Sequence, residues 1–146
     1  MQMGWYMFLA LIIGVIAAVY LPMNSSVARY LGSPLTASVT FYFIALITSI
    51  GLFFIFGDLS TLRNLTAVPA YLYLTGFISA FIVLSITFLI PVIGARKLVI
   101  LSIAGQLIMA MIVSHFGVLE SPHDPITIKK VVGAGLLVLG AVVSVS

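Results

Sequence analysis

The chain has 146 residues, of which 63% are hydrophobic and only 6% are charged. A soluble domain keeps about a quarter of its residues charged, because its surface faces water. The six basic and three acidic side chains cannot cover a globule of this size, so the composition excludes a soluble protein. It predicts an all-α integral membrane protein with the lipid bilayer as its solvent. The basic residues form no patch, which excludes a nucleic-acid partner.

Five apolar stretches each approach the ~20 residues that a helix needs to cross the hydrocarbon core. Strands of a membrane barrel are excluded, because they are about 10 residues long and alternate in polarity. The connections between the stretches are too short to hold a soluble domain, so residues 1–146 are predicted to form a single membrane domain. The predicted helices cover residues 3–21, 35–56, 69–90, 96–116 and 128–145.

The first predicted helix contains a strong local signal at Pro22, followed directly by Met23, Asn24, Ser25 and Ser26. Proline lacks a backbone N–H and clashes with the preceding turn, so it kinks or breaks a helix. One interpretation is that the helix ends at Leu21 and the polar residues form a loop. The other is that it breaks at Pro22 and resumes to residue 30, with Asn24 facing a cavity inside the membrane.

The basic residues that determine orientation are evenly divided between the two membrane faces. With five spans, one face carries Arg63, Lys129 and Lys130, and the other carries Arg29, Arg96 and Lys97. Orientation follows an excess of Lys and Arg in cytoplasmic loops, and three against three gives no excess. Either one position, such as the Arg96-Lys97 pair, fixes a single orientation, or the chain inserts both ways and pairs with an inverted copy of itself.

Polar side chains within the apolar stretches are the candidates for a substrate site, since an unsatisfied polar group in a bilayer is costly. No Asp, Glu, Lys or Arg lies in the middle of any stretch, which argues against an exchanger that relies on a buried carboxylate. Gln106 is the one amide deep in a helix, and it either holds a substrate or joins two helices by hydrogen bonding. The predicted cavity-lining residues are Asn24, Gln106, Tyr20, Trp5 and Tyr42, although the aromatic ones also suit membrane-interface anchors.

Catalytic and metal-binding patterns are not found in the sequence. His115, Glu120, His123 and Asp124 match no standard ligand spacing, and solvated loop residues are the better interpretation. The chain contains no cysteine, and no triad or phosphate-binding glycine pattern is present. We therefore expect neither an enzyme nor a metal or other cofactor.

Several segments resemble a small bacterial five-helix family of the drug/metabolite transporter superfamily. They are Asn24 with residues 31–37 (LGSPLTA), then residues 83–86 (VLSI), 91–95 (PVIGA), 104–108 (AGQLI) and 115–117 (HFG). The family often has Gln in place of Tyr20 and Asp in place of Ser114. The resemblance implies two five-helix units paired in inverted orientation and a transport function, with no particular substrate.

Together these features predict a bacterial inner-membrane secondary transporter of a small metabolite or drug-like solute. It would act by alternating access as an antiparallel homodimer, each chain being half of an inverted-repeat transporter. Two other interpretations stay open, namely a non-transporting scaffold or regulatory subunit and one half of a heterodimeric transporter.

Overall fold

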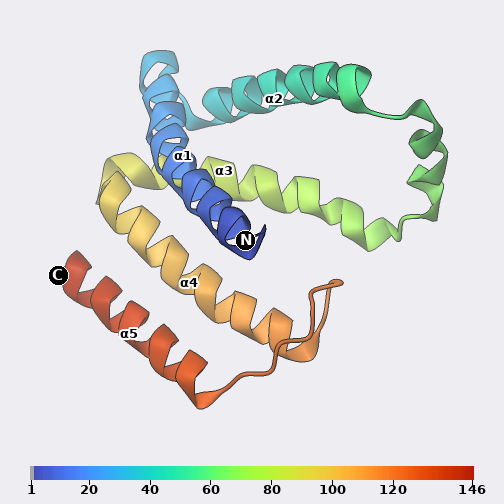
Figure 1. The fold of residues 1–146 in the computed structure, drawn as a ribbon. Helices are drawn as coiled ribbons and strands as arrows, with labels where there is room; N and C mark the ends of the chain where they lie inside the picture. Colours follow the sequence, from blue (N-terminus) through green and yellow to red (C-terminus); the bar gives the residue numbers. More distant parts are fainter. Residues whose placement is uncertain (1) are drawn as a thin grey trace. The chain divides into compact units, whose positions relative to one another are not determined.

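The computed structural model describes residues 2–146, and the secondary structure of this part of the chain is entirely helical. Its five long helices are each long and apolar enough to cross a membrane, so the prediction of an all-α integral membrane protein is confirmed (Figure 1). They are α1 (Gln2–Leu31), α2 (Pro34–Phe56), α3 (Leu74–Ile93), α4 (Ala95–Phe116) and α5 (Ile128–Val145).

The chain divides into two compact units that meet in sequence between Val92 and Ile93. The first unit contains α1, α2 and almost all of α3, and the second contains α4 and α5.

A tight turn at Gly32-Ser33 joins α1 to α2 in the first unit (Figure 1). Gly32 has a φ of +70°, which only glycine adopts without strain. The Ser33 hydroxyl caps α2 by accepting the N–H of Thr36 at 3.3 Å, and Pro34 occupies the first helical position, where its missing N–H is not needed. The two helices that leave this turn are in contact with each other.

The helix α1 is continuous through Pro22 and ends at Leu31. The first helix therefore extends beyond Leu21 to about residue 30, as one interpretation predicted, but without the break at Pro22. Proline removes one N–H and leaves the rest of the hydrogen-bond ladder available, and membrane helices tolerate the loss when nearby groups compensate. The Ser26 hydroxyl donates to the Pro22 carbonyl at 3.1 Å, one turn further on.

Two 3₁₀ helices, η1 (Leu59–Ala67) and η2 (Ala70–Tyr73), connect α2 to α3. The second of them, η2, replaces the start of the third predicted helix, so α3 begins at Leu74 rather than at residue 69. Asp58 caps η1 by accepting the Ser60 N–H at 2.8 Å and the Ser60 hydroxyl at 2.6 Å. These bonds favour the ionised carboxylate and lower the pKa of Asp58 below its usual value.

The segment η1 has an apolar face whose side chains are largely exposed. A 3₁₀ helix has 3.0 residues per turn, so Leu59, Leu62 and Leu65 lie on one face, and they are half to two thirds exposed. We expect this face to lie in the membrane interface. A spin label on Leu62→Cys should then be relaxed mainly by oxygen, whereas a label on the matched Asn64→Cys should be relaxed mainly by a water-soluble nickel chelate. Equal accessibility of the two sites would contradict this placement.

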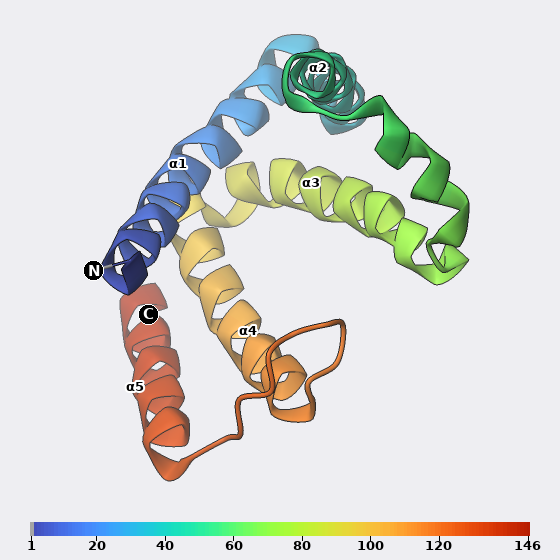
Figure 2. The ribbon, with the colours of Figure 1, turned by 45° about the vertical axis from the view of Figure 1, so that its right-hand side comes forward.

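In the second unit, α4 and α5 form an antiparallel hairpin and lie side by side in Figures 1 and 2. Gly117 ends α4 in the left-handed conformation (φ 61°), which glycine adopts readily. The Thr127 hydroxyl caps α5 by accepting the N–H of Lys130 at 3.4 Å. An ion pair between Lys130 and Asp124 closes the connecting loop.

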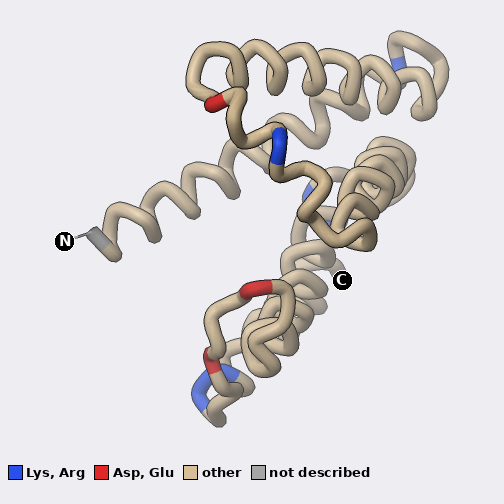
Figure 3. The backbone as a smooth tube through the Cα atoms, turned by 90° about the vertical axis from the view of Figure 1, so that its right-hand side faces the viewer, with Lys and Arg blue, Asp and Glu red and all other residues tan. Residues whose placement is uncertain are grey.

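Most large apolar side chains on the helices are exposed, whereas the buried apolar residues are few and mostly small. In water this arrangement would be unstable, but in a bilayer exposed Leu, Ile and Phe contact lipid tails. The charged residues lie in the connections and at the ends of the five long helices, and the middles of these helices carry none (Figure 3). Lipid therefore replaces the core of a soluble protein as the environment of these side chains.

Candidate functional site

A buried polar cluster links α1 to α3 within the first unit. The Asn24 amide nitrogen donates to the Thr87 hydroxyl at 2.7 Å, and the Ser25 hydroxyl donates to the Thr87 carbonyl at 3.4 Å. Thr87 is only 1% exposed, Ser25 3% and Asn24 9%. These two hydrogen bonds join α1 to α3. Asn24 was a predicted site residue, whereas sequence reasoning missed Thr87.

The hydrogen-bond pattern of Thr87 fixes which way the Asn24 amide points. A threonine hydroxyl has one proton, and that of Thr87 is donated to the Val83 carbonyl at 2.7 Å. The Thr87 oxygen can then only accept, so Asn24 must present its NH₂ group to it. The amide oxygen of Asn24 consequently points away from Thr87.

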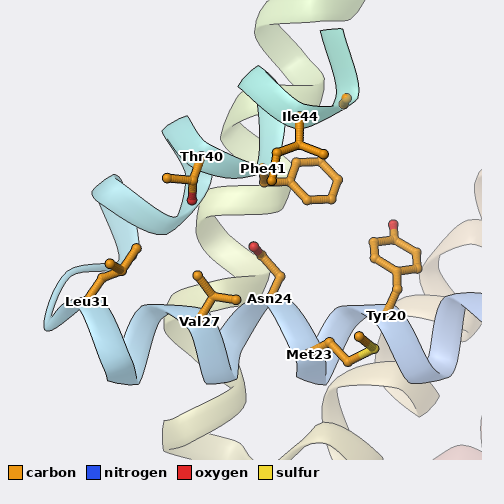
Figure 4. A pocket seen from close by; sticks show the side chains of 9 residues that line it. Tyr20, Met23, Asn24, Val27, Leu31, Thr40, Phe41 and Ile44 are labelled. Atoms are coloured by element: carbon orange, nitrogen blue, oxygen red, sulfur yellow. The ribbon is translucent and has the colours of Figure 1, made fainter. Parts of the chain in front are cut away.

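An open cavity of about 510 Å³ lies between α1 and α2, and Asn24 is one of its lining residues, most of which are exposed. Its size is in the range of known small-molecule sites, about 300–1,000 Å³. In Figure 4 the Asn24 side chain points from α1 toward Thr40 and Phe41 on α2. The rings of Tyr20 and Phe41 stack at 6.2 Å between centroids and line the same cavity. The structure thus brings two predicted residues, Asn24 and Tyr20, to one cavity.

The other predicted cavity residues lie elsewhere. Tyr42 lines a neighbouring cavity of about 620 Å³ between α2 and α3, where its hydroxyl is 2.7 Å from that of Ser79. Trp5 is 58% exposed near the start of α1 and packs against Phe8, as suits an interface anchor. Gln106 is exposed on α4 in the second unit.

The predicted topology determinants all lie at or beyond the ends of the five long helices. Arg29 is in the last turn of α1 and donates to the Ser26 hydroxyl at 3.1 Å, and Arg63 is in η1. The remaining four occupy the first turns of α4 and α5, and they are Arg96, Lys97, Lys129 and Lys130.

The α4–α5 loop uses its histidine and acidic residues for local structure. The His115 ring accepts the Ile126 N–H at its Nδ1 atom at 3.1 Å, which makes that nitrogen the unprotonated one. Asp124 pairs with Lys130, and its own N–H donates to the Ser114 carbonyl at 2.9 Å. These contacts hold the loop against the end of α4.

We expect the bond between Asn24 and Thr87 to stabilise the packing of α1 on α3. In a double-mutant cycle of Asn24→Leu and Thr87→Val, the two changes should show a coupling of about 0.6–1.7 kcal/mol, the range for polar pairs between membrane helices. Reversible unfolding in mixed detergent measures it. The pair Asn24→Leu and Ser85→Ala is the matched control, because Ser85 donates to its own helix at the Phe81 carbonyl. Additive effects in the first cycle would show that the bond contributes nothing.

Five apolar helices are able to span a membrane, carry charges only at their ends, and include a buried polar cluster between α1 and α3, which defines a multi-pass membrane protein. A family model described as "Putative inner membrane exporter, YdcZ" matches residues 5–143, and the chain belongs to this family. It is thus an inner-membrane protein of a transporter family rather than of an enzyme family. No curated protein and no solved structure matches the chain.

Proposed function

We propose that the chain is a secondary transporter of a small metabolite or drug-like solute, within the drug/metabolite transporter superfamily. It works by alternating access as an antiparallel homodimer, in which the second copy supplies the inverted half. The family match supports export across the inner membrane as the direction of transport.

The even division of basic residues between the two membrane faces is the main support for the antiparallel arrangement. Three Lys and Arg residues fall on each face when the five helices alternate in direction, so the loops give no instruction for one orientation. An odd number of spans adds to this, because two such units fused in one chain would be inverted relative to each other, as in inverted-repeat transporters. The exposed apolar side chains along the helices leave surface for a second copy as well as for lipid.

The cavity between α1 and α2 supports a transport role over a purely structural one. Its volume of about 510 Å³ accommodates a small solute, and the buried amide of Asn24 borders it. Polar groups inside a membrane are retained mainly where they bind something or join helices. Asn24 is placed to do both, with its nitrogen on Thr87 and its oxygen toward the cavity.

Two fused dimers test the proposal. A direct fusion of two copies places them in opposite orientations, whereas a fusion through one additional transmembrane helix places them parallel. We expect the direct fusion to be monodisperse in detergent and to release part of a mixture of small solutes from loaded vesicles, as mass spectrometry of the vesicle contents would show. The parallel fusion should release none and should associate further.

Each alternative gives a different result. If neither fusion released any solute although both folded, the chain would be a scaffold or regulatory subunit. If only the parallel fusion were active, the antiparallel arrangement would be wrong. If neither fusion were stable without a second, different chain, a heterodimer would replace the homodimer.

A further inference from the structure

The cavity between α1 and α2 presents hydrogen-bond acceptors to its contents. The first is the amide oxygen of Asn24, whose orientation is fixed because its NH₂ group is held by Thr87. Among residues 3–146 no fully enclosed side-chain oxygen or nitrogen lacks a partner, and no described residue donates to the Asn24 oxygen. The oxygen is therefore accessible from the cavity that Asn24 lines.

The second acceptor is the hydroxyl of Thr40, on the opposite wall. Its proton is donated to backbone carbonyls of its own helix, at 2.9 Å to Ala37 and 3.2 Å to Thr36. A hydroxyl whose single proton is already used can only accept a further hydrogen bond. Asn24 on α1 and Thr40 on α2 thus both present hydrogen-bond acceptors to one cavity.

Apart from the Tyr20 hydroxyl, which can donate or accept, the rest of the lining is apolar or aromatic, and no charged side chain contributes to it. The stacked rings of Tyr20 and Phe41 offer flat surface for an apolar or aromatic body, and the face of an aromatic ring also attracts a cation. A solute that only accepts hydrogen bonds would leave both acceptors without partners. The cost of leaving a buried polar group unpaired makes such a site discriminate strongly.

From this polarity we propose that the cavity binds amphiphilic amines, in which an N–H donor group at one end is attached to an apolar or aromatic body. The proposal rests on the transport function above and specifies its substrate class. The amine bonds to the Asn24 oxygen and the Thr40 hydroxyl, and its body packs on Tyr20 and Phe41. Thr87 is a positioning residue, because it orients the amide of Asn24 and does not line the cavity.

A matched set of probes tests the proposal by calorimetric titration of the protein in lipid nanodiscs at neutral pH. 2-Phenylethylammonium has the donor group, its N,N,N-trimethyl analogue has the same charge and body without a donor, and methyl phenylacetate has acceptors only. We expect saturable binding of the primary amine at least about tenfold tighter than binding of the other two, the size of one charge-assisted hydrogen bond. Equal affinity of the primary amine and its trimethyl analogue would overturn the proposal.

Two variants assign the effect to the cavity. Thr40→Val removes one acceptor with little change of shape and should reduce the preference for the primary amine by about threefold to tenfold. Asn24→Leu should remove most of it, and Thr40→Val keeps the test decisive if Asn24→Leu does not fold. Ser79→Ala removes the hydroxyl that contacts Tyr42 and lies outside the α1–α2 cavity, so it is the control and should bind like the wild type. A preference that survives in both cavity variants would place the amine elsewhere.

This test is separate from that of the transport function, because it measures binding alone. Selective amine binding without solute release would support amphiphilic amines as ligands of the cavity and would exclude the transport function. Release of solutes without any preference for donor groups would support the transport function and would exclude amphiphilic amines as the substrate class.

Discussion

Adding one lysine to a loop should convert a mixture of two orientations into nearly one. Each membrane face has three basic residues, so the difference in Lys and Arg between the faces is zero. A single added lysine therefore provides all of the charge difference that determines orientation. Asn64→Lys adds it to the face of the α2–α3 connection, and Ser146→Lys adds it to the opposite face. In a His123→Cys background the chain carries one thiol, in the exposed α4–α5 loop, for labelling from outside intact cells.

The two lysine variants should move the labelled fraction in opposite directions, because their charges are on opposite faces. Asn64→Lys keeps its face in the cytoplasm, and that face includes the α4–α5 loop, so external labelling should fall. Ser146→Lys should raise it. Asn64→Gln is the neutral control and should leave the fraction unchanged. A fraction that stays the same in all the variants would mean that orientation is fixed by something other than the loop charges.

Replacing Gly94 by alanine should destabilise the protein by about 1–3 kcal/mol. Gly94 is the one residue between α3 and α4, and its φ of 85° with ψ of 148° is a conformation that side chains with a Cβ rarely adopt. A Cβ at this position would meet no atom within 4 Å, so the cost is one of backbone conformation and not of space. The residue also lies next to the boundary between the two compact units.

Gly51→Ala is the matched control for this change. Gly51 lies within α2, has no positive φ, and an added Cβ there also meets no atom within 4 Å. It should be neutral or more stable by about 0.5–1 kcal/mol, because alanine favours a helix over glycine. Reversible unfolding in mixed detergent compares the two. Equal stability of the two alanine variants would show that the Gly94 conformation does not matter for folding.

The helices could be predicted from the sequence because the bilayer imposes a simple rule on length and composition. The fifth predicted range, residues 128–145, coincides with α5, and the others differ at their ends. The largest differences lie at two places. A break was predicted at Pro22, but membrane helices tolerate proline and α1 continues through it. Residues 69–73 were predicted to start the third helix, but they form the 3₁₀ helix η2 and the residue before it. The η1 helix was missed, although its leucines repeat every three residues.

The site could be predicted only in part. Asn24 was noticeable as an amide close to a proline, but its partner Thr87 is 63 residues away in sequence. No local pattern connects two such positions. Thr87 differs little from other threonines in apolar helices, and only the fold shows that its proton is used by Val83. The placement of Tyr42 beside Ser79 in a different cavity likewise depends on how α2 and α3 pack.

Insertion of the chain in both orientations can be tested by labelling the single thiol of His123→Cys in intact cells. A membrane-impermeant thiol reagent applied outside should label about half of the protein, with the rest reached only after permeabilisation, because the loops carry no net Lys and Arg bias. Labelling of all or none of the protein from outside would show a single orientation and contradict the antiparallel homodimer.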